Sequence, residues 1–189
     1  RPRLAAGLNG FIRRMQIPFF TTQMGKGTVA GGASLYMGTA ALSERDYVHE
    51  AIDRADLILA IGHDTIEKPP FIMGPEGPKV IHVGYTPATV EQVFFPHAEL
   101  VGDVAASLAL LADRLEGRLR TAGALLPLRQ EILARIGDRA TESRFPPTPQ
   151  RIVHDVRQVM PEDGIVALDN GMYKIWFARN YRTRVANTL

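Results

Sequence analysis

The sequence contains no cysteine, which excludes disulfides, thiolate metal sites and a cysteine nucleophile. It also has no apolar run near the ~18 residues that a membrane-spanning helix needs. Charge of one sign is not concentrated anywhere, because 22 Lys and Arg are scattered among 20 Asp and Glu. With this balance the sequence shows no basic run of the kind that binds nucleic acid or a membrane surface. These absences favour a cytoplasmic protein.

Short apolar runs that end in glycine are the main positive feature. They mark residues 21–27, 60–64 and 167–171. A parallel α/β sheet presents its backbone to a bound nucleotide or diphosphate in this way. Since 46% of the residues are hydrophobic, the composition is that of a globular protein. The pattern therefore predicts an α/β fold with a doubly wound parallel sheet.

Hydrophobic spacing and turn residues predict the order of the elements. Strands are expected over residues 17–21, 56–62, 79–84, 98–101 and 164–169. Helices are expected over residues 4–15, 43–52, 87–93, 103–115, 123–139, 152–159 and from 172. Ser43 and Asp103 are the expected amino-terminal caps of two of them. Residues 22–45 read mostly as a glycine-rich loop.

The predicted elements divide the chain into parts. A doubly wound domain opens on a strand, and none precedes Leu4, so the first strand and its phosphate-binding turn are expected upstream. We predict a Rossmann-like domain over residues 1–142 and a proline-rich linker over 143–149. Residues 150–189 then read as the start of a second, incomplete α/β domain.

Several candidate sites each have a plainer alternative. The glycines from Gly25 to Gly38 could cradle a cofactor or form a flexible surface loop. His63 could contact a phosphate or a flavin, or be an ordinary loop histidine. His63, Asp64 and His82 together suggest a metal, but no ligand spacing supports it.

The later strand ends carry similar alternatives. Tyr85 could stack on an adenine or pack on the sheet, and Asp103 could bind a ligand or cap a helix. The turn at 169–171 could hold a diphosphate at a helix amino terminus, or be a plain strand-to-helix turn.

Six segments carry a resemblance to a known family. They read IPFFTTQMGKG at 17–27, YMGTAALSERDY at 36–47, ADLILAIG at 55–62, VIHVGYTP at 80–87, VGD at 101–103 and DNGMYKIW at 169–176. With them the chain resembles the catalytic subunit of acetolactate synthase and related thiamine-diphosphate-dependent decarboxylases and carboligases. The likeness covers nearly the whole chain.

The resemblance implies three α/β domains, of which this chain holds the central one and the start of the third. In acetolactate synthases the central domain carries FAD, whereas other relatives hold ADP or nothing there. The third domain binds thiamine diphosphate through Mg²⁺. The resemblance places the catalytic glutamate and the magnesium ligands outside these residues, so no catalytic or metal residue is assigned and the isolated chain is expected to be inactive.

The family pattern also implies a set of cofactor-binding positions. These are Thr22, Met24, Gly25, Met37, Gly38, Gly62, His63, Tyr85, Gly102, Asp103, Gly171, Met172 and Tyr173. Acetolactate synthases usually have Gly-x-Arg-Phe where this chain has residues 62–65, and an acid near Tyr85. Their Gly-Gln-His appears here as Gly171, Met172 and Tyr173.

The activity implied is decarboxylation of pyruvate, or a similar 2-oxo acid, and joining of the two-carbon product to a second 2-oxo acid. The active site of such enzymes forms between subunits, which implies a homodimer or homotetramer, with a regulatory subunit in some members. Two alternatives stay open: another thiamine enzyme, such as a 2-oxo acid decarboxylase or an acyl-CoA lyase, and a non-catalytic nucleotide-binding module.

Overall fold

The computed structural model describes residues 2–29, 33–40, 46–63, 73–119 and 123–189. Contacts divide the chain into two compact units. Unit 1 is Arg1–Pro18 with Leu42–Gly123, and unit 2 is Phe19–Ala41 with Ala124–Leu189. The predicted domain boundaries at 142 and 149 stay a prediction.

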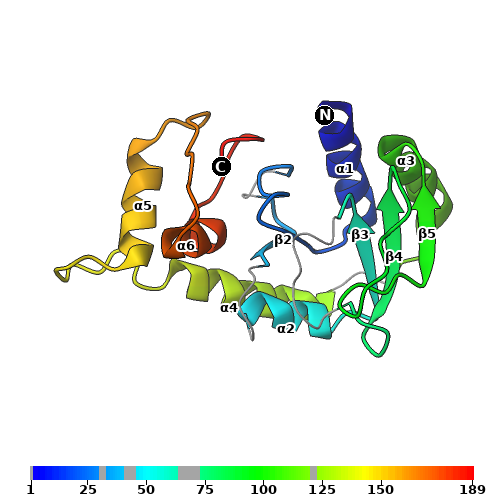
Figure 1. The fold of residues 1–189 in the computed structure, drawn as a ribbon, viewed down its shortest axis with the longest axis horizontal. Coiled ribbons are helices and arrows are strands. Elements are labelled where there is room, and N and C mark those ends of the chain that lie inside the picture. Colours follow the sequence, from blue (N-terminus) through cyan, green and yellow to red (C-terminus); the bar gives the residue numbers. More distant parts are fainter. Residues whose placement is uncertain (1, 30–32, 41–45, 64–72, 120–122) are drawn as a thin grey trace. The chain divides into compact units, whose positions relative to one another are not determined.

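Unit 1 is built on a parallel sheet in the order β3-β4-β5 (Figure 1). Its strands are β3 (Leu57–Ile61), β4 (Lys79–Gly84) and β5 (Ala98–Val101). The register aligns Ala60 with His82 and His82 with Glu99. In parallel strands all carboxyl ends lie at one edge of the sheet, so the turns after them meet there.

Helices α1 (Pro2–Met15) and α3 (Val104–Leu115) pack against each other in unit 1. Their apolar faces meet the sheet in one core cluster that contains Phe11, Met15, Val83 and Leu108. Arg14 at the end of α1 also donates to Asp113 and Glu116, at 2.9 Å each. Because these ion pairs are exposed and screened by water, they add little, and the apolar core holds the helices.

Helix α2 (Tyr47–Asp53) is shorter than predicted. Asp46, in extended conformation, caps it by accepting from the Val48 N–H. The predicted cap, Ser43, lies outside the described residues. The apolar side chains of α2, which are Val48, Ala51 and Ile52, are buried.

Unit 2 contains the short parallel pair β1 (Phe19–Thr21) and β2 (Tyr36–Thr39). A 3-10 turn at Gly123–Leu125 leads into α4 (Leu126–Gly137), which contacts β2. Helices α5 (Pro149–Val159) and α6 (Met172–Asn180) pack together over a core of Val153, Phe177 and Tyr181. Parallel strands with flanking helices confirm the predicted α/β class.

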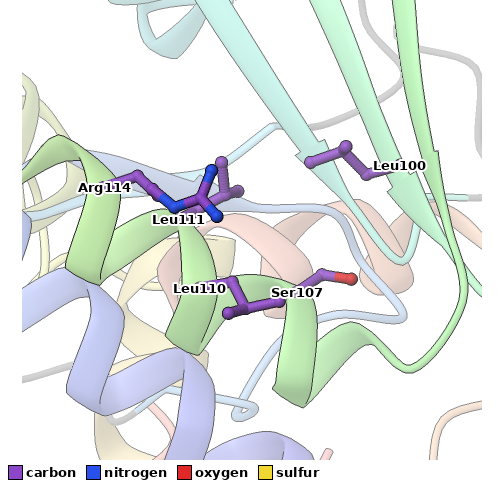
Figure 2. A pocket seen from close by; sticks show the side chains of 5 residues that line it. All are labelled: Leu100, Ser107, Leu110, Leu111 and Arg114. Atoms are coloured by element: carbon purple, nitrogen blue, oxygen red, sulfur yellow. The ribbon is translucent and has the colours of Figure 1, made fainter.

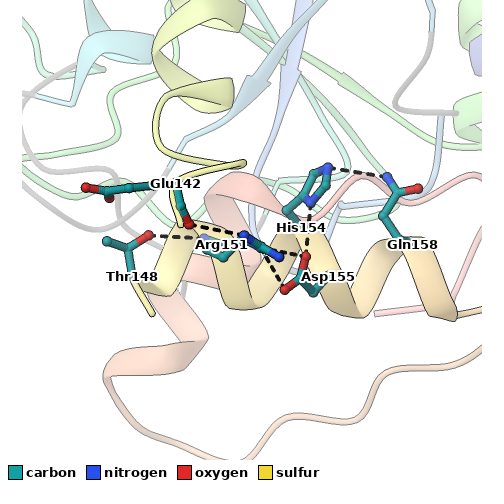
Figure 3. A network of polar contacts seen from close by, with 6 residues as sticks. All are labelled: Glu142, Thr148, Arg151, His154, Asp155 and Gln158. Atoms are coloured by element: carbon teal, nitrogen blue, oxygen red, sulfur yellow. Dashed lines mark hydrogen bonds and ion pairs between the residues drawn. The ribbon is translucent and has the colours of Figure 1, made fainter. Parts of the chain in front are cut away.

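A surface network starts α5 (Figure 3). Thr148 caps the helix by accepting from the Arg151 N–H, and Arg151 donates to both carboxylate oxygens of Asp155 at 2.8 Å. Hydrogen bonding from Arg151 holds the pKa of Asp155 below its usual range. The Arg151–Asp155 ion pair is largely exposed, so it supports the start of the helix more than it stabilises the fold, while the cap residue Thr148 is buried.

Three predicted elements are wrong. Residues 164–169 form no strand: the Val166 N–H donates to the Thr188 carbonyl at 3.0 Å, and one such bond does not make a ladder. Residues 87–93 form no helix but an irregular segment whose Glu91 and Phe94 pair in an isolated bridge. The predicted loop at 22–45 contains β2, whose four residues are all buried.

Among the described residues, no helix combines the length and the apolar character needed to cross a bilayer.

Candidate functional site

Three glycines end the three strands of unit 1 at one edge of the sheet. The Gly62 N–H donates to the Val83 carbonyl at 2.8 Å, and the Gly102 N–H to the Gly84 carbonyl at 2.9 Å. Gly62 and Gly102 have φ of 63° and 153°, and a Cβ on either would meet no atom within 4 Å. We call this edge, formed by Gly62–His63, Gly84–Tyr85 and Gly102–Asp103, the glycine edge. At Gly62 and Gly102 the backbone is open to close approach by a ligand, whereas Gly84 between them is buried against His82.

The side chains at the glycine edge differ in how they are held. His63 is half-buried, and its ring centroid lies 4.9 Å from that of Phe94 in an edge-on arrangement. Tyr85 is 60% exposed. Asp103 accepts from the Ala106 N–H at 2.8 Å, so its carboxylate caps α3 as one of the two alternatives predicted. The structure thus brings five predicted residues together, while their role in binding stays a prediction.

His82 lies directly beneath the glycine edge and is 4% exposed. Its Nε2 is 3.0 Å from the Thr86 carbonyl oxygen, and since a carbonyl only accepts, Nε2 carries the proton. Nδ1 is buried and has no hydrogen-bond partner in the described part of the chain. Asp64, considered with His63 and His82 as a metal site, lies outside the described residues. Those residues hold no group of three side chains able to bind a metal.

Substitution of Gly84 by alanine is expected to lower the free energy of unfolding by about 1–3 kcal/mol, as overpacking does. A Cβ there would overlap Nε2 of His82 and stand 3.2 Å from the Thr86 carbonyl oxygen. The buried His82 ring, 5.9 Å from Phe94, has little room to move. Urea unfolding measures the change.

Gly10→Ala is the matched control for that substitution. Gly10 lies inside α1 of the same unit, and a Cβ there meets nothing within 4 Å. Alanine should therefore raise stability by up to about 1 kcal/mol through its helix propensity. Equal losses for Gly84→Ala and Gly10→Ala would contradict the steric argument.

The other predicted residues lie in unit 2. Thr22 accepts from the Gly25 N–H at 3.1 Å, which closes a turn, and Met24 is 83% exposed. Met37 and Gly38 are in β2, where the Met37 side chain is buried. Strand β2 contacts α6. The structure therefore places Met37 inside the core and Met24 on the surface of the same unit.

Gly171, Met172 and Tyr173 begin α6. Gly171 is extended, with φ of 179°, and no side chain caps the helix amino terminus. Met172 is 74% exposed and Tyr173 46%. The first N–H groups of a helix without a cap are donors for an anion. The N–H donors at the start of α6 are of the kind that a diphosphate site needs, and the binding of a diphosphate here stays a prediction.

Lys26 is the residue that sequence reasoning missed. Its side chain is 5% exposed, and Nζ donates to the Ala178 carbonyl at 2.6 Å and to Thr39 Oγ1 at 3.1 Å. Lysine is almost never fully buried, so the residue type alone argues against this position. A lysine between two glycines, where the backbone can bend inward, was the available signal.

Burial lowers the pKa of Lys26 from 10.5 to about 7, helped by the nearby positive charge of Arg182. The carboxyl end of α6 favours a cation by only about 0.3–1 kcal/mol. Desolvation of a buried amine is worth several times that, so it decides the direction. Burial likewise raises the pKa of the Tyr36 hydroxyl, and its hydrogen bonds with Thr39 and Thr21 oppose this rise.

A separate apolar groove of about 200 Å³ lies in unit 1 (Figure 2). It is lined by Leu100 of β5 and by Ser107, Leu110, Leu111 and Arg114 of α3. No predicted site residue lines it. The groove and the glycine edge are therefore different features of unit 1.

Parallel strands that end in glycine, with helices packed on the sheet, define this chain as a parallel α/β protein. Residues 1–111 match the protein family described as "Thiamine pyrophosphate enzyme, central domain". The chain belongs to this family of thiamine pyrophosphate enzymes.

Three relatives show how the likeness extends. The chain is 33% identical to "Acetolactate synthase, catabolic" of Raoultella terrigena, over 76% of this chain and 26% of the relative. It is 25% identical to "Acetolactate synthase" of Bacillus subtilis, over 100% of this chain and 34% of the relative. It is 25% identical to "Glyoxylate carboligase" of Escherichia coli O157:H7, over 90% of this chain and 30% of the relative. The chain thus spans about a quarter to a third of these relatives.

Proposed function

We propose that this chain is part of a thiamine-diphosphate-dependent enzyme that decarboxylates pyruvate and joins the two-carbon product to a second 2-oxo acid. The observation that carries the proposal is the family match over residues 1–111 together with the acetolactate synthase relatives. The parent would then be an acetolactate synthase-like transferase or lyase, acting in branched-chain amino acid or acetoin-type metabolism in the cytoplasm. A homodimer or homotetramer, with or without a regulatory subunit, is part of the same proposal.

The glycine edge fits an adenosine nucleotide such as FAD. Open space in front of Gly62 and Gly102 allows a phosphate or ribose to approach the backbone, and Tyr85 is exposed enough to stack on a ring. The amino terminus of α3 adds N–H donors at the same edge, although Asp103 already engages one of them. In this proposal, bound FAD is structural and takes no part in bond making.

The start of α6 fits the diphosphate of the thiamine cofactor. Uncapped N–H groups after Gly171 would bind phosphate oxygens, and Tyr173 could add a hydroxyl donor. Thiamine diphosphate supplies the electron sink for decarboxylation, and the protein binds and orients it. Mg²⁺ would bridge the diphosphate to ligands that we expect outside these residues.

A second thiamine-dependent reaction is the alternative. The "Glyoxylate carboligase" relative matches 90% of the chain, which lies between the 76% and 100% that the two synthases match. The missing arginine near residue 64 and the tyrosine at 85 also separate this chain from the usual acetolactate synthase pattern. A non-catalytic nucleotide-binding module remains the other candidate.

The test uses the protein that contains these residues, with thiamine diphosphate and Mg²⁺, with and without FAD, and with pyruvate, glyoxylate or another 2-oxo acid as the substrate. Acetolactate is the expected product. Acetaldehyde, carboligation of glyoxylate alone, or no turnover of any 2-oxo acid would each reject the synthase and favour one of the alternatives.

FAD binding is measured separately, by quenching of flavin fluorescence. Tyr85→Ala should weaken it about tenfold, which corresponds to the ~1.4 kcal/mol of an aromatic stack. Leu110→Ala, on the exposed face of α3, is the control and should leave the affinity unchanged. Equal FAD affinity in the Tyr85 variant and the control would remove Tyr85 from the site.

A further inference from the structure

Lys26 connects two distant segments inside unit 2. Its Nζ reaches the Ala178 carbonyl, 152 residues further along the chain. Ala178 lies in the last turn of α6, where carbonyls have no partner within the helix. Lys26 therefore caps the carboxyl end of α6 from the glycine-rich segment that follows β1.

The segment around Lys26 is itself covered. Gly27 has φ of 83°, and a Cβ there would stand 3.3 Å from the Val185 carbonyl oxygen and 3.4 Å from Thr183 Oγ1. Only glycine combines this conformation with so close a covering backbone. The chain after α6 thus lies over Gly27, and water has little access to the amine.

The hydrogen bonds around Lys26 suit a neutral amine. Thr39 Oγ1 also lies 2.8 Å from the Tyr36 hydroxyl and 3.2 Å from Thr21 Oγ1. If Thr39 accepts from Lys26 and Tyr36 and donates to Thr21, its hydroxyl is fully used. A neutral amine has two protons for its two acceptors, Thr39 and Ala178. Among the described residues, Nζ has no further hydrogen-bond acceptor for the third proton of an ammonium.

The charged and titratable groups around Lys26 do not favour a cation. Arg182, after α6, is the charged group that acts on it, and it repels. Tyr36 of β2 is neutral, because burial raises its pKa. Arg129 of α4 donates to the backbone carbonyl of Tyr36. A proton on Lys26 is thus opposed by burial and by Arg182.

We propose that Lys26 is a positioning residue for the proposed anion-binding turn at the start of α6, and that it holds the helix more tightly as a neutral amine than when Nζ carries a third proton. The helix is rigid over its nine residues, so a hold on its carboxyl end also places Gly171–Tyr173 at its amino end. Naming the anion as a diphosphate rests on the proposed function; the hold on α6 does not.

The sign of the pH effect follows from the two states. With the helix docked, the pKa of Lys26 is about 7, and in the undocked chain it returns to its ordinary 10.5. The undocked state therefore binds more protons between these values, and docking strengthens as pH rises through this window. Each pH unit changes the docking equilibrium about tenfold. Below about pH 7 both states carry the proton, and this dependence ends.

The single tryptophan of the chain, Trp176, reports the state of α6, because it packs against the Val153, Phe177 and Tyr181 core. Urea unfolding followed by its fluorescence, between pH 6 and pH 10, compares wild type with Lys26→Met. Lys79→Met, an exposed lysine in unit 1, is the matched control. In wild type we expect the docking equilibrium of α6 to change about tenfold per pH unit above about pH 7. We expect Lys26→Met to lose this pH dependence and Lys79→Met to keep it.

Arg182→Gln is a second variant that tests the proposal even if Lys26→Met folds poorly. Removing the repelling charge should move the start of the pH dependence to higher pH. Identical pH dependence in wild type and in both variants would overturn the proposal.

A second arm titrates thiamine diphosphate and Mg²⁺ into the full protein over the same pH range. If Lys26 holds the turn, wild type gains affinity above pH 7 relative to Lys26→Met, with the larger effect in KM for the cofactor than in kcat. If unfolding followed by Trp176 fluorescence shows the expected pH dependence but no cofactor binds, the proposed function is rejected and the role of Lys26 stands. Cofactor binding with identical pH profiles would reject the role of Lys26 and leave the function standing.

Discussion

Tyr181→Ala is expected to lower the stability of unit 2 by about 3–5 kcal/mol, the usual cost of removing a fully buried aromatic ring. The Tyr181 ring is 0% exposed and stacks on Phe177 at 5.7 Å between centroids. Arg157 sits over the ring at 5.0 Å and donates to the Tyr181 hydroxyl at 2.7 Å. Alanine removes the ring contacts and the acceptor together, and leaves a cavity between α5 and α6.

Tyr181→Phe separates the ring from the hydroxyl. Phenylalanine keeps the packing but leaves Arg157 Nη1 without this acceptor, so a loss of about 1.5–3 kcal/mol is expected for a bond to a charged group. Trp176 fluorescence during urea unfolding measures both variants in unit 2. If the two substitutions cost the same, the ring contributes nothing beyond its hydroxyl and the description of this core is wrong.

Leu108→Ala is expected to lower the stability of unit 1 by about 3–5 kcal/mol. Leu108 is 0% exposed and lies where α1, α3 and β4 meet, in the cluster with Phe11, Met15 and Val83. The surrounding side chains come from three elements that fix one another, so the site can collapse only in part. The cavity therefore adds to the lost transfer free energy.

Leu110→Ala on the same helix is the control for Leu108→Ala. Leu110 is 61% exposed, and its truncation should change stability by less than about 0.5 kcal/mol. Circular dichroism during thermal unfolding compares the two. A larger loss at Leu110 than at Leu108 would mean that α3 presents its other face to the sheet.

The sequence was sufficient for elements whose burial follows from their own pattern. Strand β3 is a continuous apolar run and β4 is apolar apart from Lys79 and His82, as expected of strands in a parallel sheet covered by helices, and both form where predicted. Helix α1 likewise buries the stripe of Phe11, Ile12 and Met15. The glycines after β3, β4 and β5 then meet at one edge, because parallel order requires it.

The failures concern elements that depend on a partner. Residues 164–169 have the composition of a strand but gain one backbone bond to Thr188, so no ladder forms. Strand β2 has a glycine inside its four residues, yet it forms because β1 offers an edge for pairing. Lys26 can be buried because its Nζ donates to Thr39 and to the Ala178 carbonyl. No local sequence pattern encodes two acceptors that lie so far apart in the chain.

The two units are interleaved along the chain, and this sets an order of assembly during synthesis. All of unit 1 has been made once Gly123 is added, whereas unit 2 joins residues 19–41 to residues after 124. Closing so long a loop costs conformational entropy that only the finished core can offset. Until Ala178 leaves the ribosome, Lys26 is an ordinary hydrated ammonium on a nascent chain. The amine would then give up its proton as a late event, when the last segment of unit 2 closes over it.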